Sequence, residues 1–369
     1  MGRDTSPAYW AEFTNLQRVK QELIHSYLNG WFPKLGFWSG RVIYLDTHAG
    51  RGEHHGGQSG SPLVALETLL DHSFRDRILD RSEVRFVFIE HDAENVAILK
   101  GHLDALGGLP EKIRVTVSEN DCYQQLEEIL GTLDERGKKM APAFAFVDPY
   151  GFKVPGETLA RLLAAGRVEL FLNIIWRELD MAIAQGQEHP DGGMAETLNL
   201  VFAGDGWKEL DRDLDFDRRA DQVIDLFREI HGARWVTSIR MLGNNQATRY
   251  ILAHFTNHEA GRDLMKDCMW SVCPDGGYYA RRSDNPDQTQ LIEPEPNLEP
   301  LRLWLLGELE AQPRTWAQLN EKVRGELWRK THLSKVIRDA RNKGEILATK
   351  YGGRFSEKAN PLFTLPEED

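Results

Sequence analysis

The sequence predicts an α/β protein: a doubly wound, mostly parallel sheet with an antiparallel extension, followed by a small domain of helices and a β-hairpin. Three observations support this fold class. Short apolar runs rich in β-branched and aromatic residues alternate with segments of helical periodicity over about 41–174. Continuous apolar strands are typical of a parallel sheet covered on both faces. A segment rich in Pro, Asn, Asp and Glu, 284–300, then precedes the last part of the chain.

The elements of the larger domain follow in chain order. An amphipathic helix over about 14–35 comes first, with these apolar residues at helical spacing: Leu16, Val19, Leu23, Tyr27 and Trp31. Strands are expected at 41–46, 84–90, 113–118, 143–148 and 169–174. Helices are expected at 62–71, 92–106, 122–136 and 156–165. Beyond these, helices at 218–231 and 258–269 flank an expected antiparallel pair of strands at 235–241 and 248–255. Alternation of this kind predicts a Rossmann-like sheet with its site at the carboxyl ends of the strands.

The domain boundaries follow from the same pattern. Residues 1–283 form the larger domain, 284–300 a linker, and 301–369 the second domain. The second domain is expected to contain helices at 301–310, 316–323 and 331–343, a strand at 345–351, a Gly-Gly turn and a strand at 362–365. This order of elements resembles a winged helix, which is a helix-turn-helix with an attached β-hairpin.

Composition excludes several classes of protein. A hydrophobic fraction of 41% is ordinary for a globular protein, and no run approaches the ~20 apolar residues of a membrane span. The amino terminus lacks an apolar run of signal-peptide type. Cys122, Cys268 and Cys273 leave one cysteine unpaired and have no metal-type spacing, so we expect a cytoplasmic protein that does not bind a membrane. The net charge of −12 argues against a surface coated with nucleic-acid contacts.

The most informative motif is Asp148-Pro149-Tyr150-Gly151, at the end of the apolar run 143–147. An acid, a proline and an aromatic residue at a strand end can hold a flat ring that carries an amino group. Asp148 is expected to accept one amino N–H, the Pro149 carbonyl the other, and Tyr150 to stack on the ring. The alternative is a strand-terminal Asp-Pro turn with a core tyrosine.

A second motif lies about a hundred residues upstream, in the apolar strand ending at Asp46 and the loop that contains His48, Gly50 and Gly52. Glycines at 50 and 52 allow the backbone to pass close to a nucleotide cofactor and to turn sharply into a helix, whereas a tight turn without a ligand is the alternative. Asp46 is expected to order the loop amides. Together the two motifs suggest a methyltransferase that uses S-adenosylmethionine (SAM).

Carboxylates at the next two strand ends complete the expected cofactor site. Glu90 is the candidate for both ribose hydroxyls, while Asp92 is expected to cap the following helix. Asp121 follows the third strand and either contacts the adenine amino group or caps the helix that begins at Cys122.

Other polar residues leave alternatives open. Asn173 and Arg177, at the end of the fifth strand, either line the same crevice or act as a capping residue and a solvated charge. His48, His54 and His55 suggest a metal site, but adjacent histidines point in different directions and no third firm ligand is near, so no metal is expected.

The second domain carries the features of a nucleic-acid-binding surface. Residues 314–358 contain twelve Lys and Arg against five Asp and Glu, interleaved with Trp316, Trp328, Tyr351 and Phe355. Lys335, Arg338 and Arg341 fall on one face of the expected third helix, where a recognition helix meets a groove; these are the reasons to expect DNA or RNA as partner. The alternative is a protein-binding winged helix with a solvated basic face.

With these motifs in place, the chain resembles the three-Cys-motif partner protein family of SAM-methyltransferase-like proteins over roughly 15–270. The resemblance rests on the motifs Tyr44-Leu45-Asp46, Ala49-Gly50-x-Gly52, Gly60-Ser61-Pro62-Leu63, Phe88-Ile89-Glu90, Val147-Asp148-Pro149-Tyr150-Gly151 and Leu172-Asn173. It implies a radical-SAM-like three-Cys protein as partner. The Gly-Ser-Pro and Asp-Pro-aromatic elements are also similar to those of a ribosomal-RNA adenine methyltransferase family. Two departures are His48, where an aromatic residue is expected, and Gly151 in place of the aromatic of an Asp/Asn-Pro-Pro-aromatic motif.

The leading hypothesis is therefore a SAM-dependent methyltransferase acting on an exocyclic amino group of a nucleobase in DNA or RNA, with Asp148, Pro149 and Tyr150 as its catalytic residues. A non-catalytic adaptor with a methyltransferase fold, docking the three-Cys partner, is the first alternative. A metal-dependent nuclease or hydrolase that uses the histidines is the second.

Overall fold

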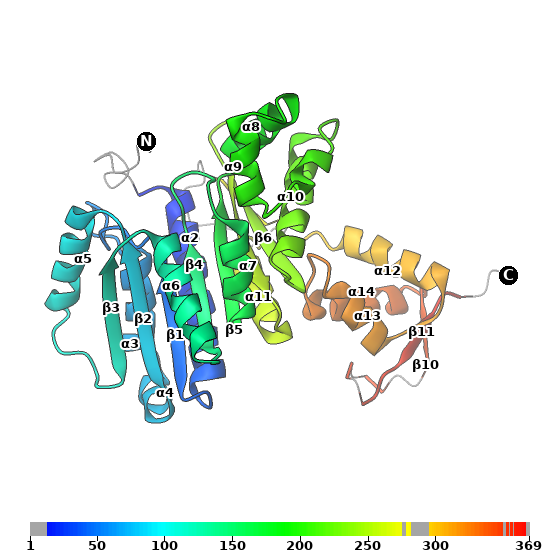
Figure 1. Cartoon of the computed structure of the whole chain (residues 1–369). Helices are drawn as coiled ribbons and strands as arrows, with labels where there is room; N and C mark the ends of the chain where they lie inside the picture. The colour runs from blue at the N-terminus through cyan, green and yellow to red at the C-terminus, as the bar shows by residue number, and fades with distance from the viewer. Residues whose placement is uncertain are drawn as a thin grey trace. The chain divides into compact units, whose positions relative to one another are not determined.

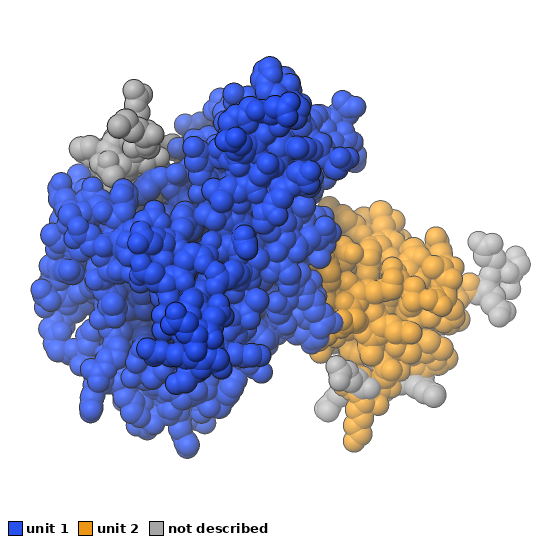
Figure 2. Space-filling view, in the orientation of Figure 1, with its two compact units in different colours: residues 1–268, 278–288 blue, residues 269–277, 289–369 orange. Residues whose placement is uncertain are grey.

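The structure, a computed structural model, divides the chain into two compact units (Figure 2), which are described separately below. Unit 1 contains residues 1–268 and 278–288, and unit 2 contains residues 269–277 and 289–369. The residues described are 13–274, 278–281, 295–349, 352–353, 355–356 and 358–366. Most of the predicted linker, 284–294, lies outside them, and its last two residues begin a helix.

Unit 1 is built on an eight-stranded sheet in the order β3-β2-β1-β4-β5-β7-β6-β8. The strands are β1 Arg41–Asp46, β2 Glu83–Glu90, β3 Ile113–Glu119, β4 Met140–Val147, β5 Gly166–Ile174, β6 Trp235–Leu242, β7 Thr248–Thr256 and β8 Tyr279–Arg281. Strands β1 to β5 are parallel, and β7 lies antiparallel between β5 and β6. The predicted fold class, a doubly wound, mostly parallel Rossmann-like sheet with an antiparallel extension, is confirmed.

Helices cover both faces of this sheet (Figure 1): α2 and α3 lie on one face, and α6 and α7 on the other. The helices of unit 1 are α2 Asn15–Gly36, α3 Ser61–Leu70, α4 Arg75–Arg81, α5 Ala93–Ala105, α6 Cys122–Glu135, α7 Gly156–Ala164, α8 Trp176–Glu188, α9 Gly193–Val201, α10 Phe216–Ile230 and most of α11 Glu259–Val272. The sequence did not predict α4, α8, α9 or β8. The apolar periodicity did not predict α8, because Asp180 and Gly186 interrupt the apolar pattern of its buried face. Asp180 is satisfied there by ion pairs with Arg212 and Arg219.

Helix α2 is fixed at its start and along its buried face. Thr14 and Gln17 form a capping box at its first turn. Further along, the carboxylate of Glu169 on β5 accepts hydrogen bonds from Tyr27 and from Trp31 Nε1, the latter at 3.2 Å. His254 Nε2 on β7 lies 3.0 Å from the same carboxylate. This buried polar cluster sets the register of α2 against the sheet, and therefore the position of the residues in the first turns of α2.

Unit 2 has three helices and a three-stranded antiparallel sheet in the order β10-β11-β9. Its elements are α12 Glu299–Ala311, β9 Arg314–Thr315, α13 Trp316–Val323, α14 Lys330–Asn342, β10 Leu347–Thr349 and β11 Leu362–Thr364. Apolar residues of all three helices, among them Leu305, Trp316 and Ile337, form its core with Phe363. The helices and strands occur in the predicted order, with β9 in addition and with β10 beginning at Leu347, two residues later than expected. The assignment as a winged helix remains a prediction.

In the part of the chain that the structure describes, no helix combines the length and the apolar character needed to cross a membrane.

Candidate functional site

A cleft opens where β1, β2 and β3 end, at the edge of the sheet that the alternating pattern predicted. Its empty volume is about 320 Å³. It is lined by Thr47, His48, Glu90, His91, Asn120, Asp121, Cys122 and Tyr123. Three of the six predicted cofactor residues, His48, Glu90 and Asp121, therefore line one cavity. The other three, Asp46, Gly50 and Gly52, support it from the β1 end and the glycine loop.

The glycine loop has a backbone that only glycine adopts easily. Gly50 has a φ of +63° and Gly52 a φ of +88°. A Cβ atom on Gly52 would lie 2.8 Å from Leu99 Cδ1, and one on Gly60 would lie 2.9 Å from the Gly52 carbonyl oxygen. Both the positive φ and the close packing require the absence of a side chain. The loop is thereby held against the start of α3 and beside the cleft.

Glu90, at the tip of β2, is 2% exposed and holds this loop in place. Its Oε2 accepts from the Gly50 backbone N–H at 2.8 Å, and its Oε1 accepts from the Asp92 N–H at 2.9 Å. His91 Nδ1 lies 3.2 Å from the same Oε1. A carboxylate has about four acceptor positions, so these contacts leave room for a ligand hydroxyl. The role found for Glu90 is structural, and the ribose contact remains a prediction.

Asp46, at the end of β1, is fully buried. It accepts from the His48 backbone N–H and from the Tyr44 hydroxyl, both at 3.2 Å, and also from the Ser61 hydroxyl. Burial raises the pKa of Asp46 to about 7, because these three donors only partly offset the cost of removing the charge from water. The predicted contact to a loop amide is present.

Two further acids cap helices. Asp121 Oδ1 accepts from the backbone N–H groups of Tyr123 and Gln124, each at 3.0 Å, so the N-cap alternative is the one found for α6. Asp92 caps α5 through the Asn95 N–H at 2.9 Å, as expected. Asp121 lines the cleft as well, and its contact to an adenine amino group remains a prediction.

His48 lies between the cleft and the target motif, Asp148-Pro149-Tyr150-Gly151. Its Nδ1 lies 2.8 Å from Thr47 Oγ1 and its Nε2 3.5 Å from Cys122 Sγ. Its ring meets Tyr123 edge-on at 6.0 Å and Tyr150 at 6.5 Å between centroids. Burial lowers the pKa of His48 to about 4, so the ring is neutral at physiological pH. A neutral ring beside the cleft places no positive charge there.

Asp148, at the end of β4, is held by side chains. Its Oδ2 accepts from Lys20 Nζ at 2.5 Å, and its Oδ1 from Asn173 Nδ2 at 2.6 Å. Burial alone raises the pKa of a carboxyl, but here the ion pair with Lys20 and the Asn173 hydrogen bond outweigh it. The pKa of Asp148 therefore lies below its ordinary value, and the carboxylate is an ionised acceptor.

Lys20 is a site residue that the sequence interpretation missed. It lies in the second turn of α2, 128 residues before Asp148, and is 6% exposed. The signal was present, because position 20 falls between Val19 and Leu23 on the apolar face of the predicted helix. A lysine on an apolar face needs a partner, since an isolated buried ammonium is costly.

Asn173 and Arg177 have different positions. Asn173 is 6% exposed and joins the Asp148 cluster. Its Oδ1 is buried and has no hydrogen-bond partner among the described residues. Arg177 is exposed in the first turn of α8, so the solvated alternative describes its position in the structure.

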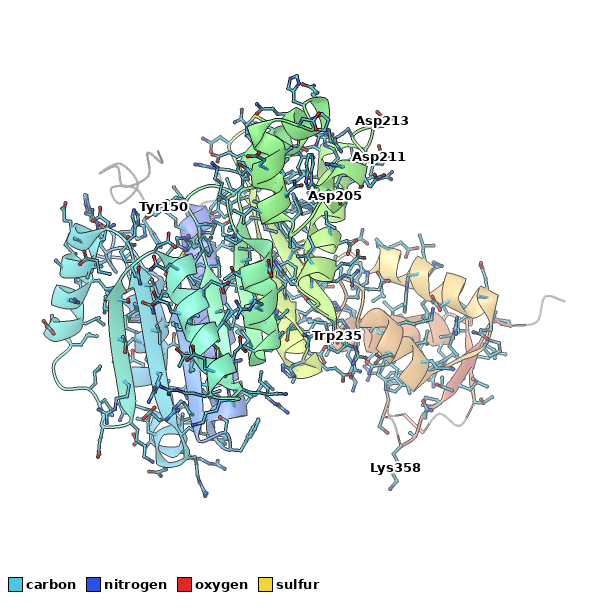
Figure 3. The ribbon with its side chains drawn as sticks, viewed as in Figure 1. Tyr150, Asp205, Asp211, Asp213, Trp235 and Lys358 are labelled. Atoms are coloured by element: carbon cyan, nitrogen blue, oxygen red, sulfur yellow. The ribbon has the colours of Figure 1, made fainter. Side chains whose placement is uncertain are left out.

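The rest of the target motif lies beside this cluster. Pro149 is buried, whereas the Tyr150 side chain is 36% exposed at the edge of the unit 1 sheet (Figure 3). Gly151 has a φ of +92°, a conformation that favours glycine. The chain thus turns away directly after Tyr150, and the ring remains accessible from solvent.

The histidines of the glycine loop have different surroundings. Among the described residues, no group of three or more His, Cys, Asp or Glu side chains is arranged to hold a metal ion. His54 is buried against the Phe13 ring at 5.1 Å, and burial lowers its pKa to about 4. His55 is exposed, and its Nε2 lies 3.4 Å from Arg51 Nη1.

The predicted nucleic-acid residues belong to unit 2. Lys335, Arg338 and Arg341 are exposed on α14, opposite the face that the core covers. Lys335 Nζ lies 3.6 Å from Glu295, and the Arg338 guanidinium lies 5.1 Å from the centroid of the Phe355 ring. Their accessibility is compatible with phosphate contacts, which remain a prediction.

Comparisons with known proteins find similar solved structures only. No protein-family model and no curated protein sequence matches the chain. A Legionella pneumophila protein described as a member of family DUF519 is 13% identical with a TM-score of 0.35, covering 64% of this chain and 84% of that chain. The cyclopropane synthase MmaA2 from Mycobacterium tuberculosis is 11% identical with a TM-score of 0.24, covering 55% and 67%. A Corynebacterium glutamicum protein is 14% identical with a TM-score of 0.24, covering 62% and 79%. Likeness of this degree leaves the function to be argued from the site.

Proposed function

We propose that this protein is a SAM-dependent methyltransferase that acts on an exocyclic amino group of a nucleobase in DNA or RNA. One observation carries the proposal: an ionised carboxylate, Asp148, and an exposed ring, Tyr150, lie at a strand end next to the cleft formed by the ends of β1, β2 and β3. His48 belongs to both, because it lines the cleft and meets the Tyr150 ring.

The residues around the cleft fit a nucleoside cofactor. Carboxylate, amide, hydroxyl and imidazole groups line it, among them Glu90, Asn120 and Thr47, and all can hydrogen-bond a ribose or a base. Gly50 and Gly52 keep side chains away from the loop backbone, and Glu90 offers its remaining acceptor positions to ribose hydroxyls. When bound, SAM supplies a methyl group on a positively charged sulfur, which becomes a neutral thioether as the C–S bond breaks and the C–N bond forms.

The protein's own groups then position the amino nitrogen. Asp148 accepts one of its N–H bonds. The Pro149 carbonyl and the Asn173 Oδ1, which has no hydrogen-bond partner in the described part of the chain, are candidates for the other. Two acceptors held by the sheet edge direct the nitrogen lone pair, and positioning of this kind supplies most of the rate in an in-line displacement. The nitrogen gains positive charge as the new bond forms and then loses one proton, to Asp148 or to water.

A nucleic acid is the substrate class that unit 2 favours. Its segment 314–358 carries twelve Lys and Arg against five Asp and Glu, opposite in sign to the whole chain, and three of these cations are exposed on α14. A base in a duplex must also be extruded before it can reach Asp148.

The test is incubation of the full chain with isotope-labelled SAM and either total RNA or genomic DNA, followed by nucleoside mass spectrometry. The proposal expects label in a base-methylated nucleoside. SAM binding without any labelled nucleoside, or no SAM binding at all, would contradict it. The second result, together with recovery of a three-Cys protein in pull-downs, would favour the adaptor alternative.

A further inference from the structure

We infer that Lys20 and Asp148 together select the target base, and that they accept a base with an amidine edge: a ring nitrogen with a lone pair beside an exocyclic amino group. Adenine and cytosine carry such an edge. Guanine does not present one to this pair and is therefore not a substrate. The inference rests on the proposed function and specifies the substrate class of the same site.

The geometry places a donor beside an acceptor. Lys20 Nζ and Asp148 Oδ2 are 2.5 Å apart, and their side chains are 7% and 17% exposed. Asn173 fixes the other carboxylate oxygen at 2.6 Å. The carboxylate retains acceptor capacity on both oxygens, and an ammonium carries three N–H groups, so each partner can bind a ligand while it keeps the ion pair.

Anchoring α2 does not explain this lysine. The helix is already held by a capping box and by Tyr27 and Trp31, which donate to the buried Glu169. Its apolar face, including Leu16, Val19 and Leu23, is buried along the same side. Removing an ammonium and a carboxylate from water costs several kcal/mol per ion, and a buried ion pair often contributes little net stability. A charged pair at the strand end beside Tyr150 is better explained by recognition.

The pair is complementary to one kind of base edge. Adenine offers an N6–H donor beside the N1 or N7 acceptor, and cytosine an N4–H donor beside the N3 acceptor. Guanine offers N1–H and N2–H donors side by side, so one of them would face the Lys20 ammonium without an acceptor. The guanine N3 that also flanks N2 lies against the sugar. Uracil and thymine have no amino group to methylate.

A hydrogen-bond donor at the ring nitrogen affects which base is bound more than it affects the rate of methyl transfer. It draws electron density from the amino group into the ring, which makes the amino N–H a stronger donor to Asp148. Leaving a buried charge without its hydrogen bond costs ~1–3 kcal/mol or more, so a base that lacks the ring acceptor is disfavoured. Lys20 is accordingly a positioning residue.

The first experiment identifies the methylated nucleoside made by the full chain from labelled SAM and total RNA or genomic DNA. The inference expects N6-methyladenine or N4-methylcytosine. N2-methylguanine or a ring-methylated base would overturn the inference while leaving a methyltransferase. No labelled nucleoside at all would overturn the proposed function with it, so the two failures are distinguishable.

The second experiment replaces the target base, in a short oligonucleotide covering the methylated site, by its 1-deaza or 7-deaza analogue for adenine, or its 3-deaza analogue for cytosine. Wild-type protein is expected to lose about 10- to 100-fold in kcat/KM on the analogue that lacks the Lys20 acceptor, the effect of one hydrogen bond to a charged group. Equal kcat/KM values on the natural base and on every analogue would overturn the inference without any variant.

The third experiment changes the protein instead of the base, by the substitution Lys20→Met. It is expected to slow transfer to the natural base by a similar factor and to abolish the preference over the deaza base. A purely structural lysine would lower both rates and keep their ratio, which would count against the inference. Lys20→Arg retains a donor and is expected to retain part of the preference. Lys34→Met, an exposed lysine in the last turn of the same helix, is the matched control and should change neither rate.

Discussion

The two halves of the proposed active site, a cofactor side at β2 and β3 and a target side at β4, hold their carboxylates in different ways. On the cofactor side, Glu90 and Asp121 accept hydrogen bonds from backbone N–H groups at the starts of neighbouring loops and helices. On the target side, the hydrogen bonds identified for the Asp148 carboxylate come from the side chains of Lys20 and Asn173. Because backbone donors are fixed by the loops and helices, the positions of these carboxylates change little when a ligand binds. Side-chain donors can reorganise around a substrate, which suits the half that we propose distinguishes one base from another.

The same difference is visible in the protonation of Asp46 and Asp148, the acids that follow β1 and β4. Burial raises the pKa of Asp46 to about 7, because hydrogen bonds from three neutral donors only partly offset the cost of removing its charge from water. Asp148 lies one strand away, and Lys20 keeps its pKa below the ordinary value. Lys20, a residue of α2, therefore keeps the Asp148 carboxylate ionised at the end of β4.

The largest expected effect concerns stability. Asp148→Ala leaves Lys20 buried without its partner, so the free energy of unfolding should fall by about 3–5 kcal/mol. Adding Lys20→Met should recover most of that loss, giving strong non-additivity in urea denaturation. Asp76→Ala, which breaks the exposed pair with Arg75, is the control and should cost under ~1 kcal/mol. Additive losses for Asp148 and Lys20 would show that the ion pair is not the feature that couples them.

The next effect tests the cofactor half alone. Glu90→Ala removes the acceptor for the Gly50 and Asp92 N–H groups, so SAM affinity should fall about 10-fold or more, as for lost hydrogen bonds to a charged group. The rate of transfer at saturating SAM should change little, because the Asp148 cluster is intact. Calorimetric titration and single-turnover rates separate the two quantities. Glu94→Ala, an exposed acid in the first turn of α5, is the control. Unchanged SAM affinity in Glu90→Ala would mean that the cleft is not the cofactor site.

The smallest expected effect is a change in the number of protons bound by Asp46. The folded-state pKa of Asp46 is about 7, so the folded protein holds more protons than the unfolded chain between roughly pH 4 and 7. Asp46 therefore costs increasing stability as the pH rises through that window, and Asp46→Asn should remove this part of the slope. A sulfonium bound nearby favours the ionised form, so SAM binding at pH 6.5 should release a fraction of one proton. Calorimetry in two buffers of different ionisation enthalpy measures this, and proton release that persists in Asp46→Asn would exclude Asp46 as its source.

Much of the cofactor half could be predicted from the sequence because its information is local. Each strand of the parallel core is a continuous apolar run, and the polar residue directly after it must lie at the carboxyl edge. Asp46, Glu90 and Asp121 are therefore close to the cleft, as the strand pattern implied. Even the backbone contacts of these acids follow from glycine and helix-cap rules that act over a few residues.

The target half could be predicted only in part, because its contacts are long-range. The sequence placed Asp148 at a strand end but gave no reason to join it to Lys20, which lies on another element 128 residues away. The position of Lys20 on an apolar helix face indicated a buried partner without saying which acid it was. Helix α8 was missed for a related reason: a buried acid, Asp180, takes a place in the pattern that an apolar residue would normally mark.

The most direct test of the central claim is the single-turnover rate of methyl transfer by Asp148→Ala protein saturated with SAM, on the nucleic acid that the wild-type chain methylates. Loss of one positioned acceptor should lower this rate about 10²–10³-fold, while SAM affinity, measured on the same preparation, stays within a few-fold of wild type. Glu157→Ala, an exposed acid in the first turn of α7, should behave as wild type. A normal transfer rate in Asp148→Ala would contradict the claim that this carboxylate holds the amino group.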